Sequence, residues 1–363
     1  MENGTDQRLK FHWRLLQGGT GSSPSIAHQH KIAQTSLPDI EAQLEFCQLA
    51  EEMDIDSLLV DFSYGKPDPI LLSTALALQT QKMKVMIAIR SGLMSPTLFA
   101  QQVNTFSTLI SGDRVTLNVV AGHSPKEQRF YGDFLSHDER YARTEEFMAI
   151  CNAFWDNNGL VNYNGNYFQV ENAKLATPFR SEGYSRPYTF ISGGSEAAKK
   201  LTINAGHCWM RFADVPEKLV ESIEPMLDAG KDVGLRLCVI PRSTRKEAIE
   251  AGNNLIKNFV DNHPEDAKGK AGAFFKESDS VSIKEIYEYS ANEWLSDCLR
   301  TGAIPFLGPS CIALVGSYEE VASAFLQYKE IGITHFILSG WPKESAMISF
   351  GKYVLPLVRE MEH

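Results

Sequence analysis

A short turn near the middle of the chain has the residue types that bind a phosphate. Ser192-Gly193-Gly194-Ser195 follows an apolar strand-like run and begins a segment with a helical pattern. Two glycines let the backbone approach an anion closely, and the free amides and positive dipole end of the helix then stabilise negative charge. The alternative is an ordinary tight turn in which Ser195 caps the helix. These residues alone leave both interpretations open.

Polar side chains also lie in or directly after two other strand-like runs. Asn118 interrupts an apolar run, and a buried Asn needs partners for its amide, which a ligand or the neighbouring backbone can supply. Lys66 and Asp68 follow the run Ser57–Phe62, at a place where a cation could hold an anionic ligand. The alternative there is a solvated turn in which Asp68 caps the next helix.

The pattern of the whole chain indicates how these residues are positioned. Short apolar runs alternate with longer segments of helical periodicity, which is typical of parallel strands covered by helices. The expected strands are Leu9–Leu16, Ser57–Phe62, Lys84–Arg90, Arg114–Ala121, Tyr188–Ser192, His207–Phe212, Gly234–Pro241 and Thr334–Ser339. They predict one closed α/β barrel, a (β/α)8 TIM barrel, as a single domain over residues 1–363. An open doubly wound sheet is the alternative, but no GxGxxG follows the first strand.

Helices are expected between these strands, with two insertions. The helical segments are Asp39–Met53, Pro96–Leu109, Glu139–Trp155, Ser195–Asn204, Pro216–Ala229, Thr244–Val260, Ser317–Ile331 and Lys343–Arg359. Residues 162–174 contain an Asn-Gly turn between short β-like runs and predict a small hairpin. The polar segment 261–300 is long for a connection within a domain, and we expect it to act as a mobile lid.

Composition narrows the function classes. The 363 residues are 43% hydrophobic and 22% charged, the balance of a globular protein. A net charge of −10 without a long basic run argues against nucleic-acid binding. The sequence contains no run of about 18 apolar residues, so it does not predict a membrane-spanning helix. Six cysteines without a CxxC pair, and an N-terminus without an apolar leader, favour the reducing cytoplasm. Neither HExxH, nor HxH on the first strand, nor GxSxG is present, so we expect no metal and no nucleophile elbow.

Six segments carry a family resemblance. They are Ile87–Pro96, Asn118–Gly122, His137–Tyr141, Ser192–Ser195, Ala313–Ser317 and Gly332–Pro342. In this order they resemble the bacterial luciferase-like flavin monooxygenases, and most closely the two-component, FMNH2-dependent alkanesulfonate monooxygenases. The resemblance extends from the first strand to the last helix. It implies a (β/α)8 barrel, a homodimer or homotetramer, and reduced FMN delivered by a separate NAD(P)H-dependent flavin reductase.

The resemblance assigns cofactor contacts to the segment at the start of the expected helix Glu139–Trp155 and to the turn Ser192–Ser195. Tyr141 would bind the FMN phosphate, and His137 would reach the phosphate or the ribityl chain, while Ser192–Ser195 would form the phosphate turn. The alternative for the helix start is a solvated surface turn, with Asp138 as the cap and Arg140 in solvent.

The resemblance also assigns residues inside the barrel. Asn118 would contact the flavin ring or a ribityl hydroxyl, and Ala88 would be small so that the isoalloxazine can lie flat. Simple core packing is the alternative for Ala88. On the first strand only one of His12 and Trp13 can face the barrel interior, because strand side chains alternate, and the sequence does not say which.

Four residues are expected to act on the substrate. Arg236 matches an active-site arginine of the sulfonate branch, and Lys66 stands near the place of a cysteine there; both would supply positive charge near a developing anion. Cys238 and Trp341 replace a histidine and a tyrosine of that branch, and would shape the substrate pocket. Lys343 replaces a further histidine. Because the donors that would hold a sulfonate differ, the substrate stays open.

We therefore expect a two-component monooxygenase that combines FMNH2 and O2 to a peroxyflavin and oxygenates a small organic substrate, while the lid excludes water. An F420-dependent oxidoreductase on the same fold is one alternative. A flavin-binding protein without turnover and a barrel without a ligand are the others.

Overall fold

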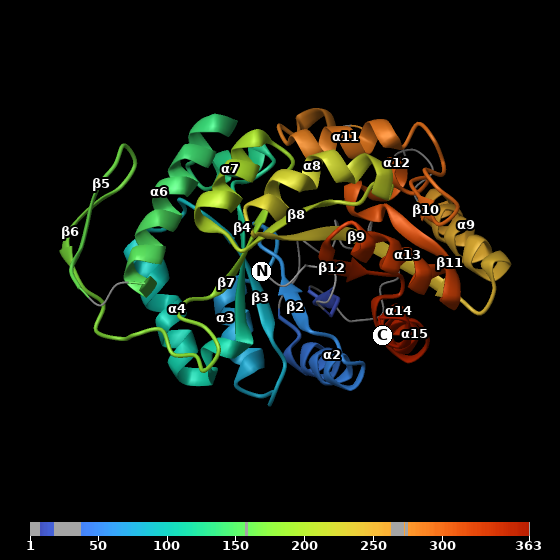
Figure 1. The fold of residues 1–363 in the computed structure, drawn as a ribbon, viewed down its shortest axis with the longest axis horizontal. Helices are drawn as coiled ribbons and strands as arrows, with labels where there is room; N and C mark the ends of the chain where they lie inside the picture. Colours follow the sequence, from blue (N-terminus) through green and yellow to red (C-terminus); the bar gives the residue numbers. More distant parts are fainter. Residues whose placement is uncertain (1–7, 18–37, 157–158, 263–271, 273–274, 363) are drawn as a thin grey trace.

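Eight parallel strands close into a barrel. The computed structural model describes residues 8–17, 38–156, 159–262, 272 and 275–362 of the chain. The barrel strands are β1 (Lys10–Arg14), β2 (Ser57–Val60), β3 (Val85–Arg90), β4 (Val115–Val120), β7 (Tyr188–Ser192), β8 (Cys208–Phe212), β9 (Asp232–Arg242) and β12 (Ile333–Ser339). Each pairs with the next in this order, and β12 pairs with β1, which closes the sheet (Figure 1). All eight predicted strands, and with them the TIM-barrel fold, are confirmed.

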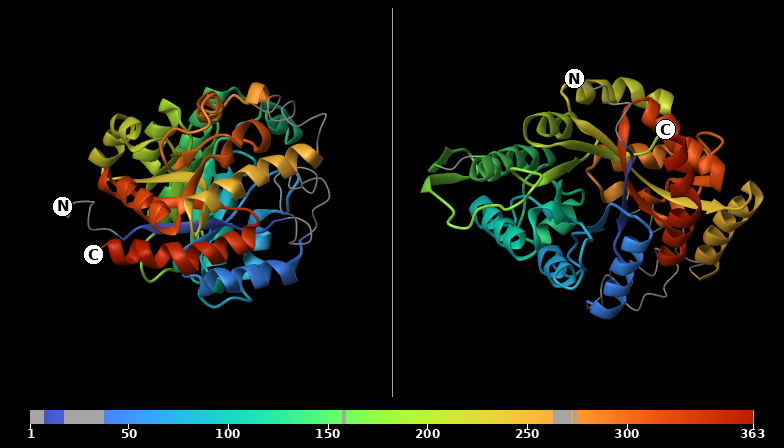
Figure 2. Two further views of the ribbon diagram at one scale, coloured as in Figure 1. Left: turned by 90° about the vertical axis from the view of Figure 1, so that its right-hand side faces the viewer. Right: turned by 60° about the horizontal axis from the view of Figure 1, so that its bottom comes forward.

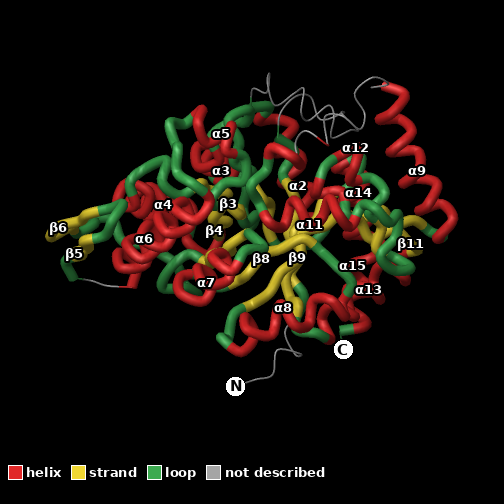
Figure 3. Tube along the Cα trace, turned by 90° about the horizontal axis from the view of Figure 1, so that it is seen from above, coloured by secondary structure: helices red, strands yellow, loops and turns green. Residues whose placement is uncertain are grey.

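Helices surround the strands (Figure 3). They are α2 (Ile40–Glu52), α3 (Pro69–Ala77), α4 (Pro96–Ile110), α5 (Pro125–Phe130), α6 (His137–Asp156), α7 (Glu196–Ala205), α8 (Pro216–Asp228), α9 (Arg245–Asn262), α11 (Val281–Tyr289), α12 (Ile304–Leu307), α13 (Tyr318–Glu330), α14 (Lys343–Ser349) and α15 (Leu355–Met361). The expected helices are confirmed to within a few residues at their ends, the last of them divided into α14 and α15; α3, α5, α11 and α12 come in addition. Asp68 and Ser95 each cap a helix that has proline in its first turn, which satisfies the free amides there. Within the described ranges no helix is both long and apolar enough to cross a membrane.

The predicted hairpin is also confirmed. Strands β5 (Val161–Asn164) and β6 (Gln169–Ala173) pair antiparallel and project from the side of the barrel beyond α6 (Figure 1). The carboxylate of Glu146 accepts hydrogen bonds from the amides of Asn166, Tyr167 and Phe168, which fixes the turn against α6. The hairpin lies away from the ends of the barrel strands.

The segment 261–300 has described parts at both ends. The predicted lid falls partly on residues 263–271 and 273–274, which lie outside the described residues, so its closure stays a prediction. The described part contains α11, which Figure 3 shows over β8 and β9. Strand β11 (Ala313–Ser317) pairs parallel with the far end of β9, and β10 (Leu299–Arg300) pairs with β11. This extension of the sheet was not expected from the sequence.

The first strand shows how the barrel separates its two faces. The imidazole of His12 lies inside, 3.0 Å from His335 Nδ1 and 2.7 Å from the Ser57 hydroxyl. Trp13, on the opposite face, packs against the C-terminal helices. His12 is therefore the residue that faces the interior, where it is satisfied by neighbours. Its pKa is lowered by burial, and next by the charge of His335, so it is a neutral part of the barrel floor.

An aromatic cluster joins the two ends of the chain. The ring of Phe336 on β12 lies 5.6 Å from Phe11 on β1 and 4.7 Å from Phe325 on α13. Phe350 packs on Phe11 at 5.1 Å. The C-terminal helices consequently lie beside the first strand and α2 (Figure 2), and this packing holds the barrel closed.

We expect Phe336→Ala to lower the free energy of unfolding by about 3–5 kcal/mol, because a fully buried ring leaves a cavity. Urea denaturation followed by circular dichroism measures the loss. The matched control is Phe134→Ala, whose ring is 76% exposed and whose removal should change stability by less than about 0.5 kcal/mol. Equal losses for the two variants would contradict this account of the closure.

Candidate active site

The inward side chains at the carboxyl ends of the strands carry most of the charge of the barrel. Arg14, Arg90 and Arg236 end or approach the ends of β1, β3 and β9, and Asp61 directly follows β2. Parallel strands of a barrel all end at one rim, which is where barrel enzymes place their active sites. The predicted site residues are therefore expected to meet at this rim.

The Ser192–Ser195 turn links β7 to α7. Ser195 is the N-cap, and its hydroxyl accepts a hydrogen bond from the Ala198 amide at 3.3 Å. Gly193 has a φ of +150°, and a Cβ atom there would collide with the Tyr141 hydroxyl. A Cβ at Gly194 would lie 3.0 Å from the Cβ of Ser282, at the start of α11. Glycine thus fits both positions because the side chains of Tyr141 and Ser282 approach the backbone closely. Ser195 caps the helix in a tight turn, and other amides at the helix start remain free.

Two of the predicted cofactor residues converge on this turn from α6. The Tyr141 hydroxyl hydrogen-bonds with the Ser195 hydroxyl, and burial raises the pKa of Tyr141, so that it stays protonated as a donor. The ring of His137 lies 4.9 Å from the Tyr141 ring. His137 also hydrogen-bonds with the exposed carboxylate of Asp138 at 2.8 Å. The structure therefore brings His137, Tyr141 and the turn together.

The solvated alternative for the start of α6 is wrong in two details. Ser136, not Asp138, caps the helix, since the Ser136 and Glu139 side chains each accept the amide of the other residue. Arg140 is only 1% exposed, because its guanidinium donates to the carbonyls of Ala121 and Leu135 at the turn of the neighbouring loop. Sequence reasoning missed this role, as charged residues in a first helical turn are usually solvated.

Arg140 also connects the segment before α11 to the rim. Its Nη2 donates to Asp279 Oδ2 at 2.6 Å. The Asp279 amide and the Ser278 hydroxyl in turn donate to the carbonyl of His123, in the loop after β4. Residues 278 and 279 therefore cover the β4 end of the rim and are fixed there by a buried charge pair.

The interior residues predicted to meet a flavin are neighbours in the sheet. Asn118 on β4 is opposite Ala88 on β3 and Phe190 on β7. The Ser192 hydroxyl donates to Asn118 Oδ1 at 2.7 Å, which leaves the Asn118 amino group as the donating end. Ala88 belongs to the inner core with Phe190, so packing explains its burial, while its small size keeps this wall flat.

A cluster of charged side chains lies at the β1, β2 and β9 part of the rim. Asp61 accepts from Arg14 Nη2 at 2.5 Å and from Lys66 Nζ at 2.7 Å. Arg236 and Lys343 are close enough to act electrostatically on both Arg14 and Asp61, and Lys343 Nζ donates to the Leu15 carbonyl at 3.2 Å. Asp61 thus pairs with Arg14 and Lys66, and the Arg236 guanidinium and the Lys343 amine lie near enough to interact with it electrostatically.

The shared charges shift every pKa in this cluster. Burial alone would raise the pKa of Asp61, but Arg14, Lys66 and Arg236 together hold it well below its usual value. Burial lowers the pKa of Lys66 to about 8 and that of Arg236 to about 10. Burial, and next the charge of Arg14, lowers the pKa of Lys343 well below the usual lysine value. The cations are therefore poorly compensated in the free protein.

Cys238 and Trp341 form an apolar wall beside these charges. Both belong to one packed cluster with Ile240 and Val315. The Cys238 thiol donates to the Ser310 carbonyl at 2.8 Å, and burial raises its pKa to about 12. A protonated, buried thiol is a poor nucleophile, so Cys238 shapes the wall and does not attack a substrate.

Arg90 contributes a further charge to the rim that sequence reasoning did not assign. Its Nη2 donates to Glu127 Oε2 at 3.0 Å, and its guanidinium lies over the ring of Phe62, 4.9 Å from the centroid. Its Nε and Nη1 have no hydrogen-bond partner among the described residues. Aromatic stacking and one carboxylate fix this arginine at the end of β3.

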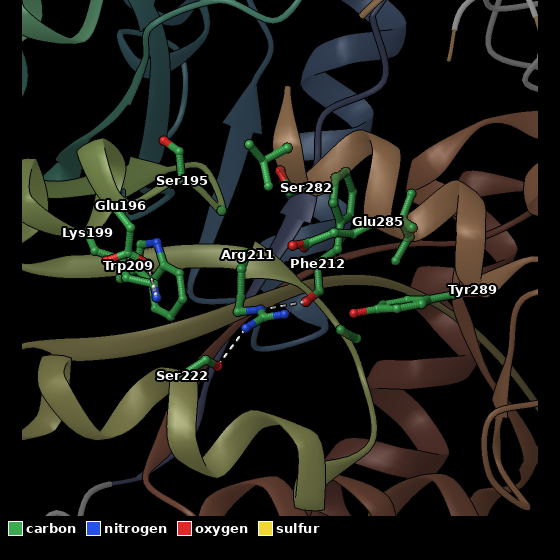
Figure 4. A pocket seen from close by; sticks show the side chains of 14 residues that line it. Ser195, Glu196, Lys199, Trp209, Arg211, Phe212, Ser222, Ser282, Glu285 and Tyr289 are labelled. Atoms are coloured by element: carbon green, nitrogen blue, oxygen red, sulfur yellow. Dashed lines mark hydrogen bonds and ion pairs between the residues drawn. The ribbon is translucent and has the colours of Figure 1, made fainter. Parts of the chain in front are cut away.

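A pocket of about 370 Å³ adjoins the turn on the outer side of β8. Figure 4 shows Arg211 near its centre, with Glu285 and Tyr289 of α11 opposite. Arg211 Nη1 donates to the Ser222 hydroxyl at 2.6 Å. The turn borders this pocket through Gly194 and Ser195.

A family model for "luciferase-like monooxygenase" matches residues 17–335, and thus covers the barrel from the end of β1 into β12. The chain belongs to the luciferase-like monooxygenase family. This confirms the predicted family and enzyme class, a flavin-dependent monooxygenase. Membership of the alkanesulfonate branch stays a prediction.

Solved structures share the fold of this luciferase-like monooxygenase. EDTA monooxygenase from Chelativorans sp. BNC1 has a TM-score of 0.77 at 18% identity, covering 98% of this chain and 94% of that one. A riboflavin lyase with modified FMN and riboflavin has a TM-score of 0.74 at 18% identity, covering 98% and 92%. An F420-dependent secondary alcohol dehydrogenase with an F420–acetone adduct has a TM-score of 0.66 at 19% identity, covering 97% and 100%.

Asp61→Asn should lower the free energy of unfolding by about 3 kcal/mol, because it removes the carboxylate that pairs with Arg14 and Lys66, the one that the described residues bring into this group of cations. Urea denaturation at neutral pH measures the loss. Asp54→Asn is the control: Asp54 pairs with Arg8 in solvent, so its neutralisation should cost less than about 1 kcal/mol. A loss for Asp61→Asn no larger than that of the control contradicts the electrostatic assignment.

Lys66 should give the stability a distinct pH dependence. Its folded pKa of about 8 lies below the value of about 10.4 in the unfolded chain. Between these values the unfolded state binds more protons, so the Lys66 contribution makes folding more favourable as pH rises; below about 8 the contribution is constant. Unfolding free energies of the parent and of Lys66→Met, measured from about pH 7 to 10, should diverge in favour of the parent above pH 8. A constant difference over this range would show that Lys66 titrates normally.

Proposed function

We propose that this luciferase-like monooxygenase binds reduced FMN with its phosphate at the Ser192–Ser195 turn and oxygenates a small organic substrate with O2 at the barrel rim. One observation carries the proposal: the hydroxyl of Tyr141, from a different helix, hydrogen-bonds with Ser195 in a turn where a Cβ atom at Gly193 would collide with that hydroxyl. A dianionic phosphate fits a site made of free amides, a helix N-terminus and hydroxyl donors.

The residues beyond the turn fit the rest of an FMN molecule. The Asn118 amino group and the Ser192 hydroxyl offer polar partners between β4 and β7 for ribityl oxygens or the ring. The small side chain of Ala88 projects little from the neighbouring strand, which suits a flat ring system. When bound, reduced FMN would supply the electrons that activate O2.

The chain itself would orient the substrate and control charge and water. Arg236 and Lys66 would stabilise negative charge that develops at the substrate, which is worth most where water is scarce. Trp341 and Cys238 would form the apolar side of the substrate pocket. Ser278 and Asp279, fixed by Arg140 and the His123 carbonyl, would cover the β4 side and keep bulk water away.

The proposal includes partners and location. A separate NAD(P)H-dependent flavin reductase would supply the reduced FMN, and the chain would assemble as a homodimer or homotetramer. It would work in the cytoplasm, which agrees with six cysteines that form no disulfide. The described residues contain no group of three or more side chains suited to a metal ion.

Binding titrations test the cofactor. Reduced and oxidised FMN should quench the protein fluorescence in a saturable way, and F420 should bind at least about tenfold more weakly. Gly193→Val should abolish FMN binding, because its side chain meets the Tyr141 hydroxyl. Tyr141→Phe should weaken it by about tenfold, the loss expected for one hydrogen bond to a charged group.

The variants need one structural control, a thermal midpoint close to that of the parent, since Tyr141 is itself buried. Tight F420 binding without FMN binding would overturn the proposal in favour of an F420-dependent oxidoreductase. Unchanged FMN binding by Gly193→Val would remove the turn from the cofactor site.

A further inference from the structure

The cationic cluster at the β1–β2–β9 side of the rim has more positive charge than its single carboxylate requires. Asp61 contacts Arg14 and Lys66 directly. Arg236 and Lys343 have no carboxylate in ion-pair contact among the described residues, although both feel the field of the other cations. The cluster is therefore incomplete as an ion-pair network.

Other buried arginines near the rim show the usual arrangement. Arg90 pairs with Glu127 at 3.0 Å, Arg140 with Asp279 at 2.6 Å, and Arg143 with Asp133 at 2.6 Å. Arg211, half-buried like Arg236, donates instead to the Ser222 hydroxyl and the Phe212 carbonyl, so each of these guanidinium groups has an acceptor, as expected from the cost of leaving a charge unpaired away from water. The Arg236 guanidinium has no such acceptor among the described residues, which points to a ligand.

The flavin phosphate is not that ligand. The proposed phosphate turn ends β7, and the strand order places β7 four strands from β1 in either direction around the barrel. The turn and the Arg14–Asp61 ion pair therefore lie on opposite sides of the rim, with Arg236 on β9 two strands from the turn. A second anion is needed to satisfy the cluster.

We propose that the substrate carries a head group with two negative charges, held by Lys66, Arg236 and Lys343 while Arg14 stays paired with Asp61. This inference rests on the proposed function for the reaction, but not for the binding. Lys66 and Arg236 are two charge-assisted donors and the buried Lys343 amine is a third donor, which favours a dianion over a monoanion because the second charge finds a charge-assisted donor of its own. The head group is a phosphate, a phosphonate or a pair of carboxylates on one carbon.

The surroundings define the rest of the substrate. Trp341 and Cys238 form an apolar wall next to Arg236 and Lys343, so the group attached to the dianion is apolar. The side chains of Lys66, Arg14 and Asp61 keep 12–16% exposure, so the cluster is not fully closed to solvent. The dianion would anchor the molecule, and its apolar part would point along the wall.

Matched amphiphiles test the charge of the head group. Isothermal titration of the full chain with hexylphosphonate and hexanesulfonate, at about pH 8, compares two ligands of nearly equal shape that differ in charge. We expect the phosphonate to bind at least about tenfold more tightly. Hexylmalonate identifies the kind of dianion: tighter binding of the malonate than of the sulfonate supports the proposal with a dicarboxylate head group. Equal binding of all three, or binding of none, overturns it.

Variants locate the site. Lys66→Met and Arg236→Met should each reduce dianion binding by about tenfold and bring its affinity close to that of hexanesulfonate. Lys246→Met, at a lysine whose side chain is 87% exposed on α9, should leave the affinity unchanged. FMN titration of the same variants separates the two proposals: FMN binding retained without dianion binding overturns only this inference, whereas loss of FMN binding in the parent overturns only the cofactor assignment.

Proton uptake gives a test that needs no variant. Lys66 is surrounded by Asp61 from the β2 end, Arg14 from β1, Arg236 from β9 and Lys343 from α14. A bound dianion would favour its charged form, so binding of hexylmalonate at about pH 8.5 should take up protons, and its affinity should fall as pH rises further. Titrations in buffers of different ionisation enthalpy measure this uptake. Binding without proton uptake would place the dianion away from Lys66.

Discussion

A closed barrel of parallel strands ends every strand at one rim, and the alternation of side chains fixes which residues meet there. The last inward position of β1 is Arg14, β9 supplies Arg236, and Asp61 follows β2. These residues are distant in sequence, yet they share a small volume from which water is largely excluded, so each charge acts strongly on the others. The Asp61 carboxylate is the group that makes this concentration of cations compatible with folding.

Local patterns were sufficient to predict most of the barrel. Almost continuous apolar runs such as Val85–Arg90 are typical of strands buried on both faces, and Ser192–Ser195 combines a strand end, two glycines and a capping serine in four residues. The orientation of His12 and Trp13 needed the structure, because both residues are compatible with either face. His12 faces inward since Ser57 and His335 complete its hydrogen bonds there.

Contacts between distant elements could not be predicted in this way. Arg14 and Lys343 come from the two ends of the chain, and only the pairing of β1 with β12 brings them together. Arg140 was expected in solvent, but two carbonyls and Asp279 surround its guanidinium. In each case the partner is a backbone or side-chain group whose position depends on the closed barrel. The contact therefore cannot be predicted from the spacing of residues along the chain.

The separation of charges around the rim has a consequence for how two anions could occupy one barrel. The free amides at the β7 end lie four strands from Arg14 at the β1 end, and Arg236 on β9 lies between them. A phosphate and an anionic substrate head group would repel each other in one pocket, whereas at separate parts of the rim each meets its own donors. On the proposed function, both molecules then extend inward from their anchored ends over Ala88 and Asn118, so that fixed charges at the rim, not contacts at the reacting atoms, would align them.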